Sequence, residues 1–437
     1  MGQNYSHLLG QSLDRSRLEL LHLLAYQASL LRMPLYLVGG VARDVLLGRA
    51  VKDFDLVVEG KSAEFAEYIV TKFGGRTLIH PRFGTATWIL NESTFNRLHV
   101  PAMDMSASPL SFDLISARSE TYSQPGALPT VKYSAIDDDL RRRDFTINAM
   151  ALRLDADYFG DLYDPLDGQK DIENKLIRVL HEGSFMDDPT RILRAVRYAA
   201  RYGFEIEPGT LKLINDAARG VLSQLSGERV RHEFDLIFEE DSAAAMLARL
   251  DELELLETVH SALRAADRRP LMIRKDKPGE EFGEFTAPDM LSFRQTLGWV
   301  LYLLNLPEGD IEAIGRRLAF PALLTKAARG ALSLNKNISS FKGLKPSQWA
   351  SRLDEFPALA VYAVYLVGRE QALYEYLTDW RSVKPYTTGY TLQGRGLEPG
   401  PRYKEIITRL RDAWLDGEVG SEEEEIKLLN ILLKEGG

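Results

Sequence analysis

The chain has 437 residues, of which 45% are apolar and 27% charged, and its formal net charge is −9. This length exceeds one ordinary hydrophobic core and predicts about two to four domains of a globular protein. Cysteine is absent, which excludes disulfides, thiolate metal sites and cysteine nucleophiles. The sequence contains neither a membrane-length apolar run nor the basic and apolar pattern of a signal peptide, so we expect a cytoplasmic protein without a membrane partner.

The order of helix and strand patterns changes along the chain. The first 35 residues have helical patterns, residues 35–155 mix strands with helices, and helix follows helix from about residue 180 onward. Segregation of this kind predicts an α+β protein with a small mixed sheet followed by all-helical domains. The strand patterns are LYLVGG, FDLVVEG, RTLIH, TATWIL, NRLHVPAM, SFDLIS and AMALRLDA.

A short strand pattern that ends in two glycines is the first feature with chemical meaning. Gly39 and Gly40 precede a helical pattern over residues 41–47, and Arg43 lies in its first turn. The start of a helix offers free N–H groups and a positive dipole end, and glycine lets a phosphate approach the backbone closely. We therefore consider Gly39, Gly40 and Arg43 candidate nucleotide-binding residues.

Three aspartates form the candidate catalytic set. Asp53 and Asp55 flank the start of a strand and point to the same side of it, because strand side chains alternate. Two carboxylates about 6–7 Å apart repel each other unless a cation lies between them, and a hard cation such as Mg²⁺ is expected there. Asp113, in the later SFDLIS strand, would complete a two-metal clamp for phosphoryl transfer. The alternative is a turn followed by a solvated strand end.

The RRRDFTINAM segment, residues 141–150, supplies further candidates. Arg142 and Arg143 can neutralise phosphates, and Asp144 can accept a hydrogen bond from a ribose hydroxyl. In the alternative interpretation, Asp144 satisfies backbone groups at a helix start. Asn148 is included with the nucleotide-binding candidates, although a structural role is the other interpretation.

The FMDDPTRIL stretch predicts recognition of a base. Asp188 and Arg191 are three residues apart and share a helix face, where they present an acceptor beside a forked donor. Cytosine and adenine carry the complementary donor and acceptor, whereas uracil and guanine reverse them. Alternatively, Asp188 is a helix N-cap and Arg191 its ion-pair partner. Arg194 and Arg197 follow on the same helix, where they meet phosphates or form a solvated face.

These motifs, in this order, resemble the bacterial class II tRNA nucleotidyltransferase and poly(A) polymerase family. The resemblance implies a nucleotidyltransferase head over residues 1–180, a base-recognising helical neck over 181–240, a helical body over 241–350 and a tRNA-binding helical tail over 351–437. It further implies that Asp53 and Asp55 bind Mg²⁺, and that Asp188 and Arg191 act as a protein template for the incoming base.

The implied activity is template-independent addition or repair of the 3′-terminal CCA of tRNA, from CTP and ATP, with release of pyrophosphate. In the family, a loop that corresponds to the long segment between Asp113 and Arg142 helps to change from C to A addition, and enzymes that add only C lack it. The alternatives are an A-adding enzyme or poly(A) polymerase of the same family, and a catalytically silent RNA-binding protein.

Two positions depart from the family pattern. Asp187 replaces the usual Glu, which shortens its reach, and Thr391 replaces an Asp in the tail, which puts a specific tail contact in doubt. Residues 316–352 contain eight Lys or Arg and no Asp or Glu. With the tail, this basic window is expected to hold tRNA through phosphate and shape contacts. The alternative is a solvated basic surface.

Overall fold

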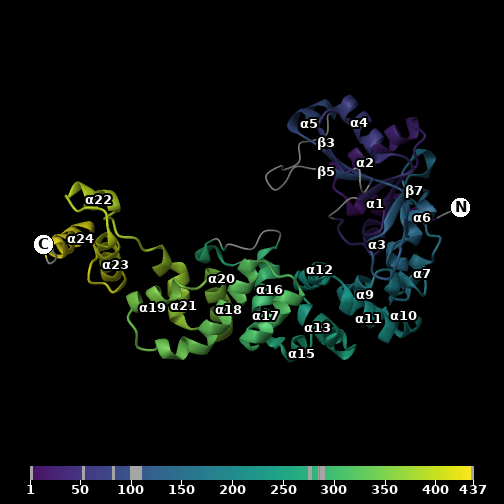
Figure 1. Cartoon of the computed structure of the whole chain (residues 1–437). Coiled ribbons are helices and arrows are strands. Elements are labelled where there is room, and N and C mark those ends of the chain that lie inside the picture. The colour runs from purple at the N-terminus through teal and green to yellow at the C-terminus, as the bar shows by residue number, and fades with distance from the viewer. Residues whose placement is uncertain are drawn as a thin grey trace. The chain divides into compact units, whose positions relative to one another are not determined.

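The computed structural model describes residues 3–51, 55–80, 84–98, 111–273, 278–283, 285 and 291–434. Two compact units make up the chain, Met1–Leu225 and Ser226–Gly437. Figure 1 shows that the first unit combines a sheet with helices, whereas the second consists of helices. The predicted α+β class is therefore confirmed. The finer division into head, neck, body and tail remains a prediction.

A seven-stranded mixed sheet organises the first unit, in the order β3-β4-β5-β2-β1-β8-β9. Strands β2 and β5 pair in parallel, and the other neighbours pair antiparallel. Six of the predicted strand patterns form strands of this sheet. Their bounds, with β9, are β1 Leu35–Val38, β2 Asp55–Val58, β3 Arg76–His80, β4 Thr85–Ile89, β5 Ser111–Ser116, β8 Ala151–Arg153 and β9 Asp161–Tyr163.

The two faces of the sheet bury different cores. One face packs against α1 (Ser6–Ser12), α2 (Arg15–Leu30) and α4 (Ser62–Phe73) through a large apolar cluster that includes Leu56 and Leu114. The opposite face carries a smaller cluster that includes Val57 and residues of α6 (Ile136–Arg141). Because side chains alternate along a strand, the aspartates of β2 and β5 belong to this second face.

Further helices and strands complete the first unit. The hairpin β6–β7 lies beside α6 of the second sheet face, whereas α3 packs into the larger apolar cluster through Val41, Ala42 and Val45. Helices α8 and α9 follow the last strand of the sheet. The bounds are α3 Gly40–Leu46, α5 Glu92–Leu98, β6 Arg118–Thr121, β7 Thr130–Tyr133, η2 Thr146–Asn148, η3 Ala156–Tyr158, α7 Gly168–Glu173, β10 Leu176–Ile177, α8 Ser184–Asp187, α9 Thr190–Tyr202, β11 Glu205–Ile206, α10 Pro208–Lys212 and α11 Asp216–Gln224.

The second unit begins with helices around an aromatic core. Trp299, which is fully buried, packs against Phe234 and Phe238. The bounds of these helices are α12 Gly227–Phe238, α13 Ala243–Glu252, α14 Leu255–Val259, α15 Ala262–Ala265, η4 Arg269–Ile273, η5 Glu280–Phe282, α16 Phe293–Leu303, α17 Glu308–Arg317, α18 Ala322–Asn337, η6 Ile338–Phe341, α19 Pro346–Leu353, α20 Ala358–Gly368, α21 Gln371–Thr378 and η7 Trp380–Ser382.

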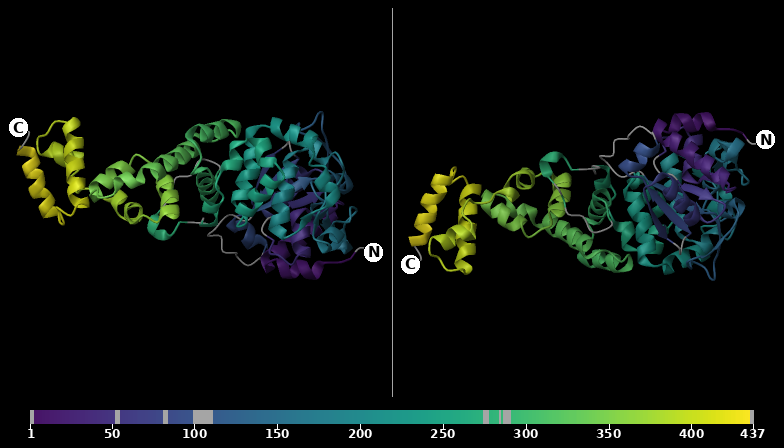
Figure 2. Two further views of the ribbon diagram at one scale, coloured as in Figure 1. Left: turned by 90° about the horizontal axis from the view of Figure 1, so that it is seen from below. Right: turned by 90° about the horizontal axis from the view of Figure 1, so that it is seen from above.

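The last three helices have a small core of their own. Figure 2 shows α22 (Gly389–Gly394), α23 (Pro401–Leu415) and α24 (Glu422–Lys434) packed together in yellow. Leu392, Leu410 and Leu429 form the centre of that core. Within the described part of the chain, no helix has the length and apolar character needed to cross a membrane.

Candidate active site

Two of the predicted catalytic aspartates lie side by side on the second sheet face. Asp55 starts β2 and pairs in register with Asp113 of β5, so the two carboxylates point to one face from strands about 5 Å apart. Asp113 is exposed and accepts a hydrogen bond from Thr87 Oγ1 at 2.6 Å. Asp53 lies outside the described residues, so its predicted position beside Asp55 stays a prediction.

The paired carboxylates suit a hard divalent cation. Carboxylate oxygens are the ligands that Mg²⁺ prefers, and a cation would relieve the repulsion between them. Among the residues that the structure describes, no three His, Asp or Glu side chains form a metal-binding group, and Asp53 is not among those residues. Asp55 and Asp113 therefore fit a metal ion as two of its ligands.

The glycine turn lies at the same end of the sheet. Antiparallel pairing of Leu37 with Leu56 places the end of β1 beside the start of β2. Gly39 has a φ of +64°, which disfavours any other residue, and a Cβ at this position would lie 2.5 Å from Arg143 Nη1. The turn thus brings a glycine backbone, a guanidinium and the two carboxylates to one region of the fold.

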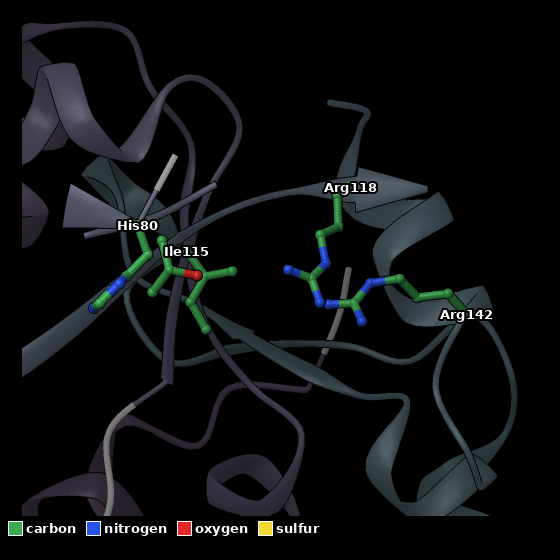
Figure 3. A pocket seen from close by; sticks show the side chains of 5 residues that line it. His80, Ile115, Arg118 and Arg142 are labelled. Atoms are coloured by element: carbon green, nitrogen blue, oxygen red, sulfur yellow. The ribbon is translucent and has the colours of Figure 1, made fainter. Parts of the chain in front are cut away.

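Next to the carboxylates, an open hollow of about 300 Å³ contains a concentration of positive charge. His80 pairs with Thr85, and Thr85 pairs with Ile115, so these residues form a row across the sheet two positions along from Asp113. Figure 3 shows Arg118 and Arg142 reaching toward each other across the hollow from His80 and Ile115.

Buried carboxylates hold these arginines in place. Asp139 is fully buried and accepts from Arg142 at 2.8 Å and from Arg143 at 2.9 Å. Glu120 accepts from Arg142 at 2.9 Å and from Arg118 at 3.2 Å. Burial alone would raise the pKa of Asp139, but Arg143 and Arg142 bring it below the ordinary Asp value. Burial, and then the charge of Arg142, lowers the pKa of Arg118. Three guanidinium groups thus face two carboxylates, which favours an anionic ligand.

Asp144 is occupied by protein donors. Its Oδ1 accepts from Phe145 N and Asn148 Nδ2, both at 2.9 Å, and its Oδ2 accepts from Arg194 Nε at 2.9 Å and Nη2 at 2.6 Å. Burial raises its pKa, but Arg194 and Asn148 bring the pKa below its ordinary value. The bond from Phe145 N agrees with the alternative interpretation of backbone satisfaction. A ribose contact remains a prediction.

Arg43 is buried beside the glycine turn. It donates to Asp44 through Nε at 2.9 Å and to Asn148 Oδ1 through Nη1. Its guanidinium carbon lies 4.5 Å from the ring centroid of Tyr202, within the range of a cation–π interaction. A Cβ at Gly40 would lie 3.2 Å from Arg43 Nη2. Arg43 therefore supports the turn from the protein side, and direct contact with a triphosphate remains a prediction.

Of the predicted base-reading residues, Asp188 lies in the connection between α8 and α9 with an extended backbone, and Arg191 lies in the first turn of α9. The predicted shared helix face is therefore wrong, because Asp188 precedes the helix. Asp188 Oδ1 accepts from Thr190 N at 3.1 Å and Thr190 Oγ1 at 2.7 Å. Arg191 is buried and donates through Nη1 to Ser184 Oγ at 2.7 Å and through Nη2 to Arg142 O at 2.8 Å. These contacts connect Arg191, through the main chain of Arg142, with the group of three arginines formed by Arg118, Arg142 and Arg143.

The next two arginines of α9 do not form a purely solvated face. Arg194 donates to the buried Asp144, and Arg197 is itself buried with its guanidinium 4.9 Å from the Tyr198 ring. Sequence reasoning missed Tyr198 and Tyr202, although their spacing of four places them on one helix face.

Comparison with known proteins identifies the family. A model described as "Poly A polymerase head domain" matches residues 35–178, and a model described as "Probable RNA and SrmB- binding site of polymerase A" matches residues 203–266. An A-adding tRNA nucleotidyltransferase of Halalkalibacterium halodurans is 32% identical over 92% of this chain and 90% of that protein. The chain belongs to the tRNA nucleotidyltransferase and poly(A) polymerase family.

Other relatives of this nucleotidyltransferase have different named activities. The A-adding enzyme of Geobacter sulfurreducens is 32% identical over 97% of this chain, but the match covers only 48% of that protein. The CCA-adding enzyme of Geobacillus sp. is 27% identical over 90% of this chain and 91% of that protein. A solved apo CCA-adding enzyme has a TM-score of 0.73 at 28% identity and covers 98% of this chain and 99% of its own. For the Thermotoga maritima CCA-adding enzyme complexed with tRNA, the TM-score is 0.69 at 27% identity, with 99% of both chains covered.

The segment between Asp113 and Arg142 of this nucleotidyltransferase contains regular structure that its sequence does not predict. Where a loop was expected, β6 and β7 form a hairpin. In the connection between them, Gly126 N donates to Met186 O of α8 at 3.0 Å. Tyr122 donates to Glu120 at 3.1 Å, and burial followed by the charge of Glu120 raises the pKa of Tyr122 to about 12. The hairpin connection therefore contacts the element that precedes Asp188.

The two departures from the family pattern have local partners. Asp187 lies 3.7 Å from His181 Nε2. In the tail, Thr391 forms a reciprocal capping box with Thr388: Thr388 N donates to Thr391 Oγ1 at 3.2 Å, and Thr391 N donates to Thr388 Oγ1 at 3.4 Å. Thr388 Oγ1 thus caps α22, and the hydroxyl of Thr391 accepts from the main-chain N–H of Thr388, so the reciprocal bond of the capping box is kept without an Asp.

Proposed function

We propose that this nucleotidyltransferase adds the 3′-terminal CCA of tRNA from CTP and ATP and releases pyrophosphate. The observation that carries the proposal is the shared location of two sets of residues. Asp188 and Arg191, which have the donor and acceptor pattern for C and A, belong to the same compact unit as the paired carboxylates Asp55 and Asp113.

The proposed reaction is in-line attack of the RNA 3′-hydroxyl on the α-phosphate of the nucleotide, with pyrophosphate as the leaving group. When bound, Mg²⁺ supplies activation of the hydroxyl and charge stabilisation, and Asp53, Asp55 and Asp113 are the residues that would hold it. Arg142 and Arg143 neutralise the triphosphate, and the Gly39–Gly40 turn lets it approach the main chain. Catalysis then depends on positioning and electrostatics, without a covalent enzyme intermediate.

Base selection needs no nucleic-acid template in this proposal. The Asp188 carboxylate accepts from the exocyclic amino group of C or A, and the Arg191 guanidinium donates to the adjacent ring nitrogen. Uracil and guanine place a donor and an acceptor in the reverse order, so both protein groups would be left unpaired. Unpaired buried polar groups are costly, which is how such a site rejects a base.

We further propose that the second unit holds the tRNA. CCA-adding enzymes similar to this chain have been solved with tRNA, with ATP and with CTP, which supports these ligands here. The basic window at residues 316–352 is partly compensated, because Arg329 pairs with Glu308 and, at 3.3 Å, with Glu312. The remaining lysines of the window and the capped tail helix α22 are therefore the better candidates for contact with the phosphate backbone.

A second candidate is addition of the terminal A alone. The specific observation in its favour is that two relatives at 32% identity over more than nine-tenths of this chain are named A-adding, whereas the CCA-adding enzyme of Geobacillus sp. is 27% identical. Both candidates use the same chemistry and the same base-reading pair. They differ in whether the enzyme also accepts CTP and the two shorter tRNA ends.

Incorporation into three tRNA transcripts distinguishes the candidates. The transcripts end before CCA, after C and after CC, and each is incubated with Mg²⁺ and with CTP, ATP, UTP or GTP, singly and together. Extension of all three to CCA followed by a stop supports CCA addition. Extension of only the CC-ending transcript, by one A, supports A addition. A long A ladder indicates a poly(A) polymerase, and no incorporation by the Mg²⁺-supplemented enzyme contradicts the proposal.

A further inference from the structure

Ser184 contacts both members of the proposed base-reading pair. It is the first residue of α8 and is fully buried. Its hydroxyl oxygen accepts from Arg191 Nη1 at 2.7 Å, and its carbonyl oxygen accepts from Asp188 N at 3.2 Å. One residue thus contacts both members of the pair, Arg191 through its side chain and Asp188 through its main chain.

Arg191 has a second anchor on the other side of its guanidinium. Nη2 donates to Arg142 O at 2.8 Å, so the two terminal nitrogens are held by different segments of the chain. A guanidinium is planar and carries five N–H donors in a fixed geometry. Two anchors on different nitrogens therefore fix both its position and its rotation, whereas one anchor alone would let it pivot.

We propose that Ser184 is a specificity-determining positioning residue, which holds Arg191 in register with Asp188 for the Watson–Crick edge of the incoming nucleotide. The inference rests on the proposed function, because it assigns Ser184 to a site whose ligand is that nucleotide. Ser184 acts through Arg191 and itself touches neither the base nor the phosphates.

The expected effect is on selectivity more than on rate. Rejection of uracil and guanine depends on donors and an acceptor that cannot move to meet the wrong base. An Arg191 side chain that pivots about the Arg142 carbonyl can adjust to those bases. The carboxylates Asp55 and Asp113 belong to the sheet and not to α8, so the reacting groups keep their arrangement.

Ser184→Ala tests this inference in the full-length enzyme. Steady-state incorporation of each of the four nucleotides is measured on the CC-ending tRNA, and selectivity is the ratio of kcat/KM for ATP to that for UTP or GTP. We expect this ratio to fall roughly 10- to 100-fold, the range that one hydrogen bond to a charged group spans, while kcat for ATP changes much less. Unchanged selectivity in an active, folded variant overturns the inference.

Ser62→Ala is the matched control. Ser62 is also buried in the first unit, and its hydroxyl donates to Gly84 O at 2.8 Å. The substitution removes the same chemical group without touching Asp188 or Arg191, so selectivity should stay at the wild-type value. A loss of selectivity equal to that of Ser184→Ala would mean that the loss reflects general loosening of the unit, and would overturn the inference.

A double variant separates positioning from a general structural effect. If Ser184 acts through Arg191, then Ser184→Ala causes no further loss of selectivity in an Arg191→Ala background, whereas independent effects add. Should Ser184→Ala fail to fold, Ser184→Cys replaces it, because sulfur fills the site but accepts hydrogen bonds weakly. Wild-type selectivity in a folded Ser184→Cys enzyme overturns the inference. Failure of the proposed function is distinct, because the wild-type enzyme would then extend only the CC-ending transcript, add a long A ladder or incorporate nothing.

Discussion

Loss of the Arg194 guanidinium should weaken the first unit in a pH-dependent way. Arg194 donates twice to Asp144 Oδ2, at 2.9 and 2.6 Å, and Asp144 is almost completely buried. Arg194→Leu keeps an apolar stem on α9 but leaves a buried carboxylate with only the donors to its Oδ1. We therefore expect Arg194→Leu to lower the free energy of unfolding of this unit at pH 7.

The magnitude follows from the burial of the two partners. Breaking a fully buried ion pair costs about 3–5 kcal/mol, because the remaining charge is uncompensated. The side chain of Arg194 is 32% exposed, so solvent already screens part of the interaction, and Asn148 still donates to the carboxylate. We expect a loss of about 2–4 kcal/mol. The double variant Asp144→Asn with Arg194→Leu removes both charged groups and should regain part of the lost free energy of unfolding.

The pH dependence has a definite sign. The pKa of Asp144 is lowered in the folded protein, so its stabilisation is present above about pH 3.9, the ordinary Asp pKa, and is lost as the pH falls through the folded value. In Arg194→Leu the carboxyl stays buried without its partner, so its folded pKa rises. The deficit relative to wild type should therefore narrow as the pH falls from 7 toward 5.

Trp88 provides a local readout of this unit. The chain has five tryptophans, and Trp88, which is fully buried, is the one within residues 1–225. Fluorine-labelled tryptophan and urea titration followed by ¹⁹F NMR report its unfolding separately from that of the second unit. A variant within about 0.5 kcal/mol of wild type at pH 7, or a deficit that is equal at pH 7 and pH 5, would refute the reasoning.

Three further predictions concern the sheet, the turn and the tail. Asp55→Ala should lower incorporation on the order of 10³-fold while filter binding of tRNA is unchanged, and full activity would exclude this carboxylate from the chemistry. Gly39→Ala should destabilise the protein by about 1–3 kcal/mol and raise KM for ATP. The control is Gly48→Ala, because Gly48 has a φ of +63° but no neighbour close to its added Cβ, so it measures the cost of the backbone conformation alone. Equal effects of the two variants would contradict a role for the contact with Arg143. Thr391→Val should weaken tRNA binding but not kcat at saturating tRNA, and unchanged affinity would rule out a contribution of the Thr391 hydroxyl.

Strand alternation made much of the first unit predictable. Six strand patterns became sheet strands, and the expectation that Asp113 lies near Asp55 agrees with their register. The NRLHVPAM pattern was wrong for residues 96–98, which belong to helix α5, and its remaining residues lie outside the described part of the chain. The overlooked signal was Asn91, whose side chain accepts from Thr94 N at 3.0 Å and caps that helix.

Contacts between segments that are distant along the chain could not be predicted from the sequence. The spacing of Asp188 and Arg191 predicted a shared helix face, which is wrong because Asp188 precedes α9. No local pattern predicts that Arg191 donates to Ser184 and to the main chain of Arg142. The hairpin β6–β7 was hidden by the turn formers around Pro125, because a hairpin needs them at its tip as much as a loop does. Such pairings depend on the three-dimensional approach of segments and not on periodicity.

A closed ring of contacts connects helix α3, which follows the Gly39–Gly40 turn, with helix α9. Arg194 Nη2 donates to Tyr198 Oη at 3.3 Å, the rings of Tyr198 and Tyr202 stack at 6.0 Å, and Tyr202 lies against Arg43. Asn148 and Asp144 complete the circuit back to Arg194. The ring therefore holds α3, η2 and α9 as one frame.

That frame restricts where the proposed nucleotide site can change shape. A shift of α9 relative to α3 would have to break a buried ion pair and a cation–π contact together, each of which is costly. Helix α8 is held differently, because it contacts the hairpin connection through Met186 O and Arg191 through Ser184. A movement of α8 would displace Ser184 and the main chain before Asp188 without opening the ring. Under the proposed function, a change at α8 would therefore alter selectivity while the groups proposed to hold the triphosphate keep their places.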